Sequence, residues 1–328
     1  MSNNFPRLVA DIGGTNARFS LEISPFNYEK TRVLPCKDYL DLSDAVQAYF
    51  AIEKIERIEH AAFAMPCPIS GDTILMVNSP WKMTSISQTK QKLGLANIVF
   101  LNDFHALALA IPHIPQDKLV HCGGNAPDTA RPIGIIGPGT GLGVASLIRH
   151  PTGEYIAIPA EGGHSSFTPV SREEIELWDF AQKRFQHVSF ERFVSGPGLQ
   201  LIYEAVCSVK KVPITTMPTP AEINSRAMNN ECWLCQLTLD HFCRMLGTAC
   251  SNLATMVNAF GGIYIGGGVV PRVLPYFLKS DFRCRFEDKG RLRQHLEKIP
   301  VYVITHEFPA FLGVSYALDI YIKKGYLP

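Results

Sequence analysis

The sequence has 328 residues, which predicts two domains, and its 46% of hydrophobic residues are enough for two cores. It carries 31 lysines and arginines against 30 acidic residues, a formal net charge of +1, which argues against nucleic acid or an anionic membrane surface as a partner. We find neither a signal peptide nor a window of about 18 uninterrupted apolar residues, so we expect a cytoplasmic protein without a membrane span. The nine cysteines are then expected to be reduced.

The N-terminal third alternates predicted strands and helices. An apolar run over residues 8–10 enters Asp11-Ile-Gly-Gly-Thr-Asn16, and residues 17–23 alternate apolar and polar, which indicates a strand, a glycine turn and a second strand. Further along, the periodicity predicts helices and strands in alternation: a helix over 41–59, a strand over 61–65, a helix over 85–94, a strand over 98–101 and a helix over 104–111. This order predicts an α/β domain.

A carboxylate at the end of an apolar strand is the first candidate site residue. The predicted strand 98–101 runs directly into Asn102-Asp103, and ligands of open α/β sheets collect at such strand ends. Asp103 is placed to accept the proton of an alcohol in phosphoryl transfer, and Asn102 offers a donor and an acceptor to a polyol. Either residue could equally cap the helix that follows.

The second half opens with another glycine hairpin. After a polar loop over 114–131, which marks a domain junction near residue 112, residues 133–148 again predict a strand, a glycine turn and a strand. Helices then dominate, and the expected elements are a strand over 155–158, a helix capped by Ser171-x-x-Glu174, a helix after Ser195-Gly-Pro-Gly198, a long helix over 236–260 ended by Gly261-Gly262, strands over 263–265 and 299–304, and a helix over 310–323.

The two glycine hairpins resemble each other and suggest two related halves. Neither fits a Rossmann or P-loop motif, because a strand follows the turn after Gly137-Pro-Gly139-Thr-Gly141-Leu-Gly143 and no Gly-Lys-Ser/Thr is present. Bare amides and a threonine hydroxyl suit phosphate oxygens. The alternative is a structural role, because a tight hairpin also needs glycine at positions with positive φ. Asp11 beside the first turn could hold Mg²⁺ or a metal-bound water, or could simply start the turn.

Three further side chains suit sugar hydroxyls. Glu161-Gly-Gly-His164 pairs a carboxylate with an imidazole, and Glu191 lies just before Ser195-Gly-Pro-Gly198; taken alone, each is also an ordinary surface or core residue. One cysteine pair, Cys232-Trp-Leu-Cys235, is more typical of a helical coincidence than of a metal or redox site, since no second pair follows at a suitable spacing.

Together, these motifs resemble those of bacterial glucokinases. DIGGTNARF, FLNDF, GPGTGLGV, AEGGH, ERFVSGPGL and GGIYIGGGVVPR occur in the family's order, and FEDKGR near the C-terminus resembles the same group. The resemblance covers almost the whole chain and implies a two-domain α/β fold of the actin-like ATPase (ribonuclease H-like) type, with a cleft between a smaller and a larger α/β domain. The implied domains are residues 1–113 plus 305–328 and residues 114–304.

The resemblance also implies roles for individual residues. Asp103 would be the catalytic base for the sugar 6-hydroxyl, and ATP and Mg²⁺ would be required. Glucose would be held by Asn102, Asp103, Glu161, His164, Glu191 and, at the mouth of the site, Asn78. The nucleotide and its phosphates would lie against Ala10, Asp11, Ile12, Gly13, Gly14, Thr15, Gly139, Thr140, Gly141, Gly266, Gly267 and Gly268, with Asp11 holding Mg²⁺ through water.

The sequence departs from the related repressor/kinase family. The cysteine cluster that binds zinc there is absent, since Ser165-Ser-Phe-Thr follows His164, and Asp11 leaves no room for a DNA-binding helix-turn-helix before it. The resemblance therefore favours a zinc-free glucokinase acting on glucose and ATP, with a homodimer as the default assembly. A kinase for fructose, mannose or an amino sugar, or a non-catalytic sugar sensor on the same fold, stays open.

Overall fold

The structure is a computed structural model that describes residues 4–76, 79–81 and 83–328. The chain divides into two compact units. Unit 1 comprises Met1–Gln116, His150–Pro159 and His306–Pro328, and unit 2 comprises Asp117–Arg149 and Ala160–Thr305. Within the described residues, every helix is too short or too polar to cross a lipid bilayer.

Unit 1 is built on a five-stranded sheet in the order β3-β2-β1-β4-β7. β1 is antiparallel to β2 and parallel to β4, and β4 is parallel to β7. The elements of this unit are β1 (Arg7–Ile12), β2 (Asn16–Ser24), β3 (Asn27–Pro35), η1 (Cys36–Asp38), α1 (Leu42–Glu53), β4 (His60–Met65), β5 (Thr73–Leu75), β6 (Met83–Ser85), α2 (Ile86–Leu93), β7 (Asn97–Asn102), α3 (Asp103–Ala110), η2 (Ile111–His113) and α12 (Pro309–Lys324).

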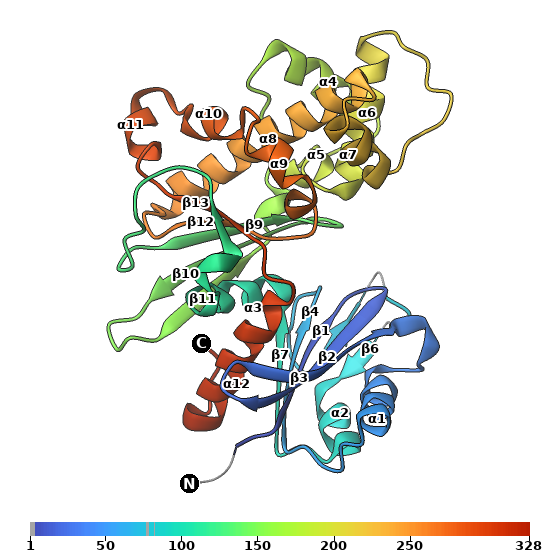
Figure 1. Ribbon diagram of the computed structural model, residues 1–328, viewed down its shortest axis with the longest axis vertical. Helices are drawn as coiled ribbons and strands as arrows, with labels where there is room; N and C mark the ends of the chain where they lie inside the picture. Colours follow the sequence, from blue (N-terminus) through green and yellow to red (C-terminus); the bar gives the residue numbers. More distant parts are fainter. Residues whose placement is uncertain (1–3, 77–78, 82) are drawn as a thin grey trace. The chain divides into compact units, whose positions relative to one another are not determined.

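Helices cover both faces of this sheet (Figure 1). Leu8 and Ala10 of β1 pack in one apolar cluster with Val46 and Tyr49 of α1. Side chains alternate between faces along a strand, so the intervening Val9, which is also fully buried, turns to the other face. There α12 contacts β1, β4 and β7 and packs along α3. Unit 1 is thus a three-layer α/β/α structure.

Unit 2 repeats the strand connectivity of unit 1. β9 is antiparallel to β10 and parallel to β12, and β12 is parallel to β13, so β10-β9-β12-β13 matches β2-β1-β4-β7; β8 adds an antiparallel edge strand. The remaining elements of this unit are η3 (Gln116–Lys118), β8 (Leu119–His121), β9 (Ile133–Pro138), β10 (Leu142–Arg149), η4 (Gly162–His164), α4 (Arg172–Gln182), α5 (Phe190–Phe193), α6 (Gly196–Val209), α7 (Pro220–Met228), α8 (Trp233–Val257), β12 (Gly262–Ile265), η5 (Val270–Val273), α9 (Leu274–Phe277), α10 (Phe282–Glu287), η6 (Gly290–Leu292), α11 (Arg293–Leu296) and β13 (Val301–Ile304). The strand β11 (Tyr155–Ala160) belongs to the His150–Pro159 segment of unit 1 except for its last residue.

Both predicted glycine hairpins and most predicted elements are confirmed, but several boundaries differ. The helix predicted over 41–59 ends at Glu53, where Lys54 adopts a left-handed cap. The long helix predicted to end at Gly261 ends at Val257, because Asn258 takes the left-handed position at φ 54°. Ser171 caps α4 as predicted, yet the Glu174 carboxylate accepts from the backbone N–H of Val170 and not of Ser171. β3, β5, β6 and β8 were not predicted.

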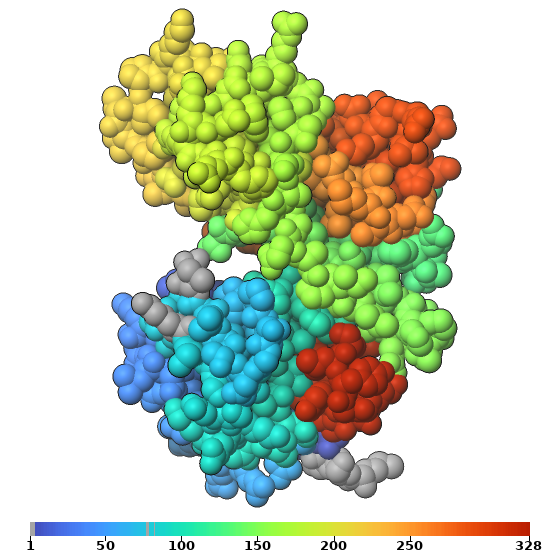
Figure 2. Space-filling view, turned by 180° about the vertical axis from the view of Figure 1, so that it is seen from behind, coloured from blue at the N-terminus to red at the C-terminus, as the bar shows by residue number. Residues whose placement is uncertain are grey.

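The contact between α3 and α12 is a backbone-to-backbone approach at Gly313. A Cβ atom built on Gly313 would lie 1.7 Å from the carbonyl oxygen of Ala106, so no residue with a side chain fits there while α3 keeps its position. The outer side of α12 is exposed, as the red segment in Figure 2 shows. Gly313 therefore fixes how closely the C-terminal helix packs on the helix that begins at Asp103.

We predict that Gly313→Ala lowers the free energy of unfolding of unit 1 by about 3 kcal/mol, the upper end of the usual cost of overpacking. The cost arises because the atom that blocks the methyl group is a backbone oxygen. Urea unfolding measures the loss, and Lys323→Ala on the exposed side of the same helix is the control, expected to stay within about 0.5 kcal/mol. Equal stability of Gly313→Ala and the parent protein would contradict the packing described here.

Candidate functional site

In unit 1, the first glycine turn is a tight and partly open hairpin. The backbone N–H of Gly13 donates to Asn16 O at 2.8 Å, and the N–H of Cys36 donates to Thr15 O at 2.8 Å. The flanking side chains of Ala10 and Ile12 are buried in the core, so these two residues can offer a ligand only their backbone. Gly14 is partly open and Thr15 is exposed, which leaves their amides and the threonine hydroxyl accessible.

Asp11 forms an ion pair at this hairpin. Its carboxylate lies 3.2 Å from Nη1 of Arg18, and a quarter of the Asp11 side chain is exposed. Desolvation raises the pKa of the Asp11 carboxyl above its ordinary value, and the Arg18 charge opposes this shift. A partly open carboxylate beside free amides fits a hydrated Mg²⁺ ion, whose hard charge prefers oxygen ligands.

Asn102 and Asp103 form the N-terminus of α3. The Asn102 side-chain oxygen accepts from the N–H groups of Phe104 and His105 at 2.9 and 3.2 Å, and its Nδ2 lies 3.5 Å from Cys67 O. The Asp103 carboxylate accepts from Phe104 N at 2.9 Å, where the helix dipole favours a negative charge. Asn102 is therefore the helix cap, one of the two roles that the sequence left open.

The strand register brings these residues to one edge of the sheet. Asp11 pairs with Ala64 across β1 and β4, and Ala64 pairs with Leu101 across β4 and β7. Asp11 and Leu101 thus lie two strand spacings apart, about 10 Å. Burial and the negative charge of Asp103 together raise the pKa of the Cys67 thiol to about 11, which agrees with a carboxylate facing the end of β4.

In unit 2, the second glycine turn is held by Glu191. One carboxylate oxygen of Glu191 accepts from Leu142 N at 2.8 Å, and the other lies 3.9 Å from Nε2 of His164. Ser195 caps α6 and donates its hydroxyl to Glu191 O at 2.8 Å. Glu191 therefore connects the turn with the residues predicted to hold a sugar.

The Glu161–His164 segment packs directly on the same turn. A Cβ atom on Gly163 would lie 2.0 Å from the carbonyl oxygen of Leu142, so only glycine permits this approach. His164 and Glu161 are exposed beside the packed glycine, and His164 O lies 2.9 Å from Nε2 of His187. Three predicted sugar contacts, Glu161, His164 and Glu191, thus lie around one glycine turn.

The third glycine run completes this edge of unit 2. The N–H of Gly266 donates to Ile136 O at 2.9 Å, and the N–H of Gly196 donates to Gly139 O at 2.8 Å. A pocket of about 430 Å³ opens between these segments, and it is lined by Gly139, Thr140, Gly196, Pro197, Leu199, Gln200, Pro220, Ala221, Asn224, Gly268, Val269 and Arg272. Gly141, Gly266 and Gly267, also predicted for the nucleotide, are not among the lining residues.

Asn224 gives this pocket an unused acceptor. Its side chain is buried, and within the described part of the chain no donor reaches its Oδ1 atom. An orphaned buried oxygen is costly unless a ligand satisfies it. Together with the open space at Gly139, where a Cβ atom would meet nothing within 4 Å, this acceptor fits a nucleotide that donates a hydrogen bond. No motif in the sequence marked Asn224 or Arg272.

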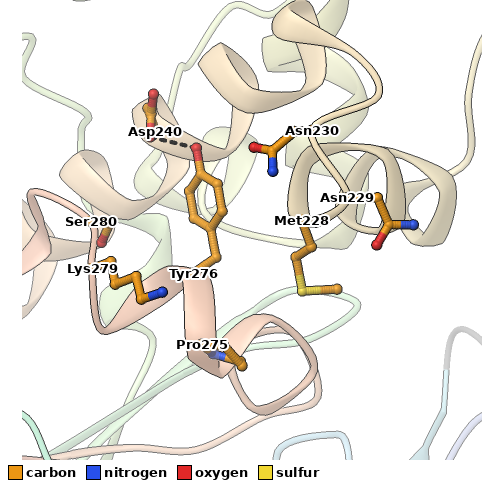
Figure 3. Close-up of a pocket in the computed structure, with 8 residues that line it drawn as sticks. All are labelled: Met228, Asn229, Asn230, Asp240, Pro275, Tyr276, Lys279 and Ser280. Carbon is orange, nitrogen blue, oxygen red and sulfur yellow. Dashed lines mark hydrogen bonds between the residues drawn. The ribbon is translucent and has the colours of Figure 1, made fainter.

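A larger pocket of about 550 Å³ contains none of the predicted site residues. Figure 3 shows its lining, where the Tyr276 hydroxyl donates to Asp240 at 2.7 Å. Over the described residues, no group of three or more His, Cys, Asp and Glu side chains is arranged to bind a metal ion. Asn78, predicted at the mouth of the sugar site, lies outside the described residues.

The comparisons with known proteins agree with one another. The family model described as "Glucokinase" matches residues 8–320. A glucokinase of Neisseria gonorrhoeae is 48% identical over 321 residues, 98% of this chain and 97% of the relative. The crystal structure of a glucokinase from an Antarctic psychrotroph is 33% identical, with a TM-score of 0.86, and covers 96% of this chain and 98% of its own.

A more distant structure carries ligands. A ROK family glucokinase from Streptomyces griseus, in complex with glucose and AMPPNP, has a TM-score of 0.64 at 18% identity and covers 96% of this chain and 99% of its own. At that identity the likeness concerns the fold alone. The predicted two-domain α/β fold of the actin-like ATPase type is confirmed by these neighbours.

We predict that Glu191→Ala destabilises unit 2 by about 1.5–3 kcal/mol, the usual worth of a hydrogen bond to a charged group, because Leu142 N–H loses its acceptor. Glu191→Gln keeps an acceptor oxygen and should recover most of that loss. Urea unfolding of both variants makes the comparison. If the glutamine variant is as unstable as the alanine variant, the contact with Leu142 does not hold the turn.

Proposed function

The chain belongs to the glucokinase family, and we propose that it uses Asp103 as the general base when it transfers the γ-phosphoryl group of ATP to the 6-hydroxyl of glucose. The activity itself, ATP-dependent phosphorylation of glucose, follows from the near-full-length identity of 48% to a named glucokinase. That identity is the single observation that carries the assignment. The roles of individual residues are the proposal, and they rest on the contacts described above.

Asp103 accepts the proton in this mechanism. The sugar hydroxyl oxygen bonds to the γ-phosphorus while the bond from that phosphorus to the ADP oxygen breaks, and the hydroxyl proton passes to the Asp103 carboxylate. The N-terminus of α3 supports this role because it favours an ionised side chain. The Asn102 oxygen already caps the helix and one amide N–H points to Cys67 O, so the second amide N–H remains to donate to a sugar oxygen.

The sugar hydroxyl groups form hydrogen bonds with Glu161, His164 and Glu191. One Glu191 oxygen is taken by Leu142 N–H, which leaves the other to accept a hydrogen bond from a hydroxyl group. His164 can donate or accept, depending on its tautomer. This division explains why both a carboxylate and an imidazole are held by the same turn.

Each unit by itself offers a glycine turn to phosphate oxygens. Gly14 and Thr15 lie open at the turn of unit 1, and Thr140 lies open at the turn of unit 2, whereas the N–H groups of Gly13 and Gly139 donate within their own turns. Asp11 would hold a hydrated Mg²⁺, which neutralises negative charge on the phosphates when it is bound. The nucleotide base and ribose fit the pocket lined by Asn224, Gly268 and Arg272.

We expect Asp103→Asn to lower turnover about 10²–10⁴-fold, the usual contribution of a general base, and to leave the dissociation constant for glucose within a few-fold of its parent value. The measurement is ADP formation from Mg-ATP, with glucose binding followed separately. Asp117→Asn, at an exposed carboxylate, is the control. Normal turnover of Asp103→Asn would refute the role of Asp103.

The same assay covers the choice of sugar. Glucose should give the highest kcat/KM among glucose, mannose, fructose, glucosamine and N-acetylmannosamine. A different preferred sugar would keep Asp103 as the base and change the assigned substrate, whereas sugar binding without ADP formation would favour a sensor.

Asn224→Ala is expected to raise the KM for ATP about 5–10-fold, which corresponds to one lost hydrogen bond of about 1–1.4 kcal/mol, without changing the KM for glucose. Asn229→Ala is the matched control, because Asn229 follows the same helix and lines the larger pocket of Figure 3 instead. If Asn229→Ala raises the KM for ATP and Asn224→Ala does not, the nucleotide binds in that other pocket.

A further inference from the structure

The cysteine pair Cys232-Trp-Leu-Cys235 lies at the N-terminus of α8. Cys232 is the N-cap of α8, and Cys235 is the third residue of that helix. Residues at these positions face each other, as the reciprocal hydrogen bonds between Thr219 and Glu222 at the start of α7 illustrate. The two thiols therefore lie at the same end of one helix, where the Cys235 thiol hydrogen-bonds to Cys232.

The surroundings distinguish the two thiols. Cys232 is partly exposed, whereas Cys235 is fully buried. Desolvation disfavours the Cys232 thiolate and by itself would raise the pKa of the thiol. The pKa of Cys232 is nevertheless lowered, because the thiolate is stabilised by hydrogen bonds from the N–H of Cys235, the Cys235 thiol and the N–H of Leu234, and by the charge of Arg226. Burial, followed by the interaction with Cys232, raises the pKa of Cys235. The accessible thiol is thus the one whose thiolate is stabilised.

Neighbouring helices enclose the pair. α6 and α7 both pack against α8; Figure 1 shows the three helices, and Figure 2 shows the segment that includes α7 in yellow at the surface. α6 contributes Cys207 and Tyr203, both buried, and burial together with the three thiols raises the pKa of Tyr203 to about 12. α7 contributes Arg226. An oxidant can therefore reach the Cys232 thiol, and the buried Cys235 thiol lies next to it.

We propose that Cys232 and Cys235 are a reversible oxidation site, with Cys232 as the thiol that attacks a peroxide and Cys235 as the thiol that resolves the product. The Cys232 thiolate attacks one oxygen of hydrogen peroxide, the O–O bond breaks, and sulfenic acid and hydroxide form. Cys235 sulfur then attacks Cys232 sulfur, the S–O bond breaks, and the thiol proton leaves with hydroxide as water. Two thiols and one peroxide give one disulfide and two waters.

All nine cysteines are free in this structure, so the reduced state is the starting point of the test. The full-length protein is reduced, desalted, treated with an equimolar amount of hydrogen peroxide, alkylated, and digested without reductant for mass spectrometry. We expect a peptide linked through Cys232 and Cys235 that dithiothreitol reverses. In the reduced protein, alkylation of Cys232 should show a pH midpoint below that of an ordinary thiol.

Variants separate the two roles. Cys235→Ser should stop at a sulfenic acid on Cys232 that dimedone traps, while Cys284→Ser, at an exposed thiol on α10, should leave the linked peptide unchanged. A link from Cys232 to Cys207, first oxidation at Cys284 or an ordinary pH midpoint would each overturn the proposal. Because the readout is chemical, it does not depend on the activity assigned above.

Discussion

Parallel hydrogen bonding between neighbouring strands is the constraint on which the candidate residues of each unit depend. β1, β4 and β7 run in one direction, so Asp11 and Asn102 reach the same edge of the sheet in unit 1; β9 and β12 do the same for Gly139 and Gly266 in unit 2. Because all six residues of β4 are buried, a slip of one residue would exchange the two faces of the strand. The register that packs the core therefore also aligns the candidate site.

Local patterns were enough to predict the elements that carry this alignment, and they failed where distant contacts decide. The glycine hairpins and the apolar strand before Asn102 have strong local signals. β8 does not, because its three residues become a strand only by pairing with β13, about 180 positions later in the chain. The end of α8 was misplaced for another reason: Asn258 can adopt the left-handed cap, and Gly261 instead lies against Arg131 O, where a Cβ atom would be 2.6 Å away.

The candidate site was predictable as a set of residue types, but not as a network. Glu191 was predicted to read hydroxyl groups, and its second contact, to an N–H 49 residues earlier, has no signal in the sequence. Asn224 had no motif at all and stands out only because its buried oxygen lacks a partner among the described residues. One Glu191 oxygen holds the glycine turn through Leu142 N–H, and the other can accept a hydrogen bond from a hydroxyl group. The same carboxylate would therefore connect hydroxyl binding with the conformation of the turn.

The close packing of α12 on α3 has a consequence for protein synthesis. Unit 1 needs residues 306–328 to complete it, yet the ribosome makes them after all of unit 2. Most of unit 2 can therefore fold during translation, before α12 is available to pack on β1, β4 and β7. The nascent chain is most exposed to chaperones and proteases before α12 is made. This exposure ends when α12 packs on α3 and Gly313 contacts the α3 backbone.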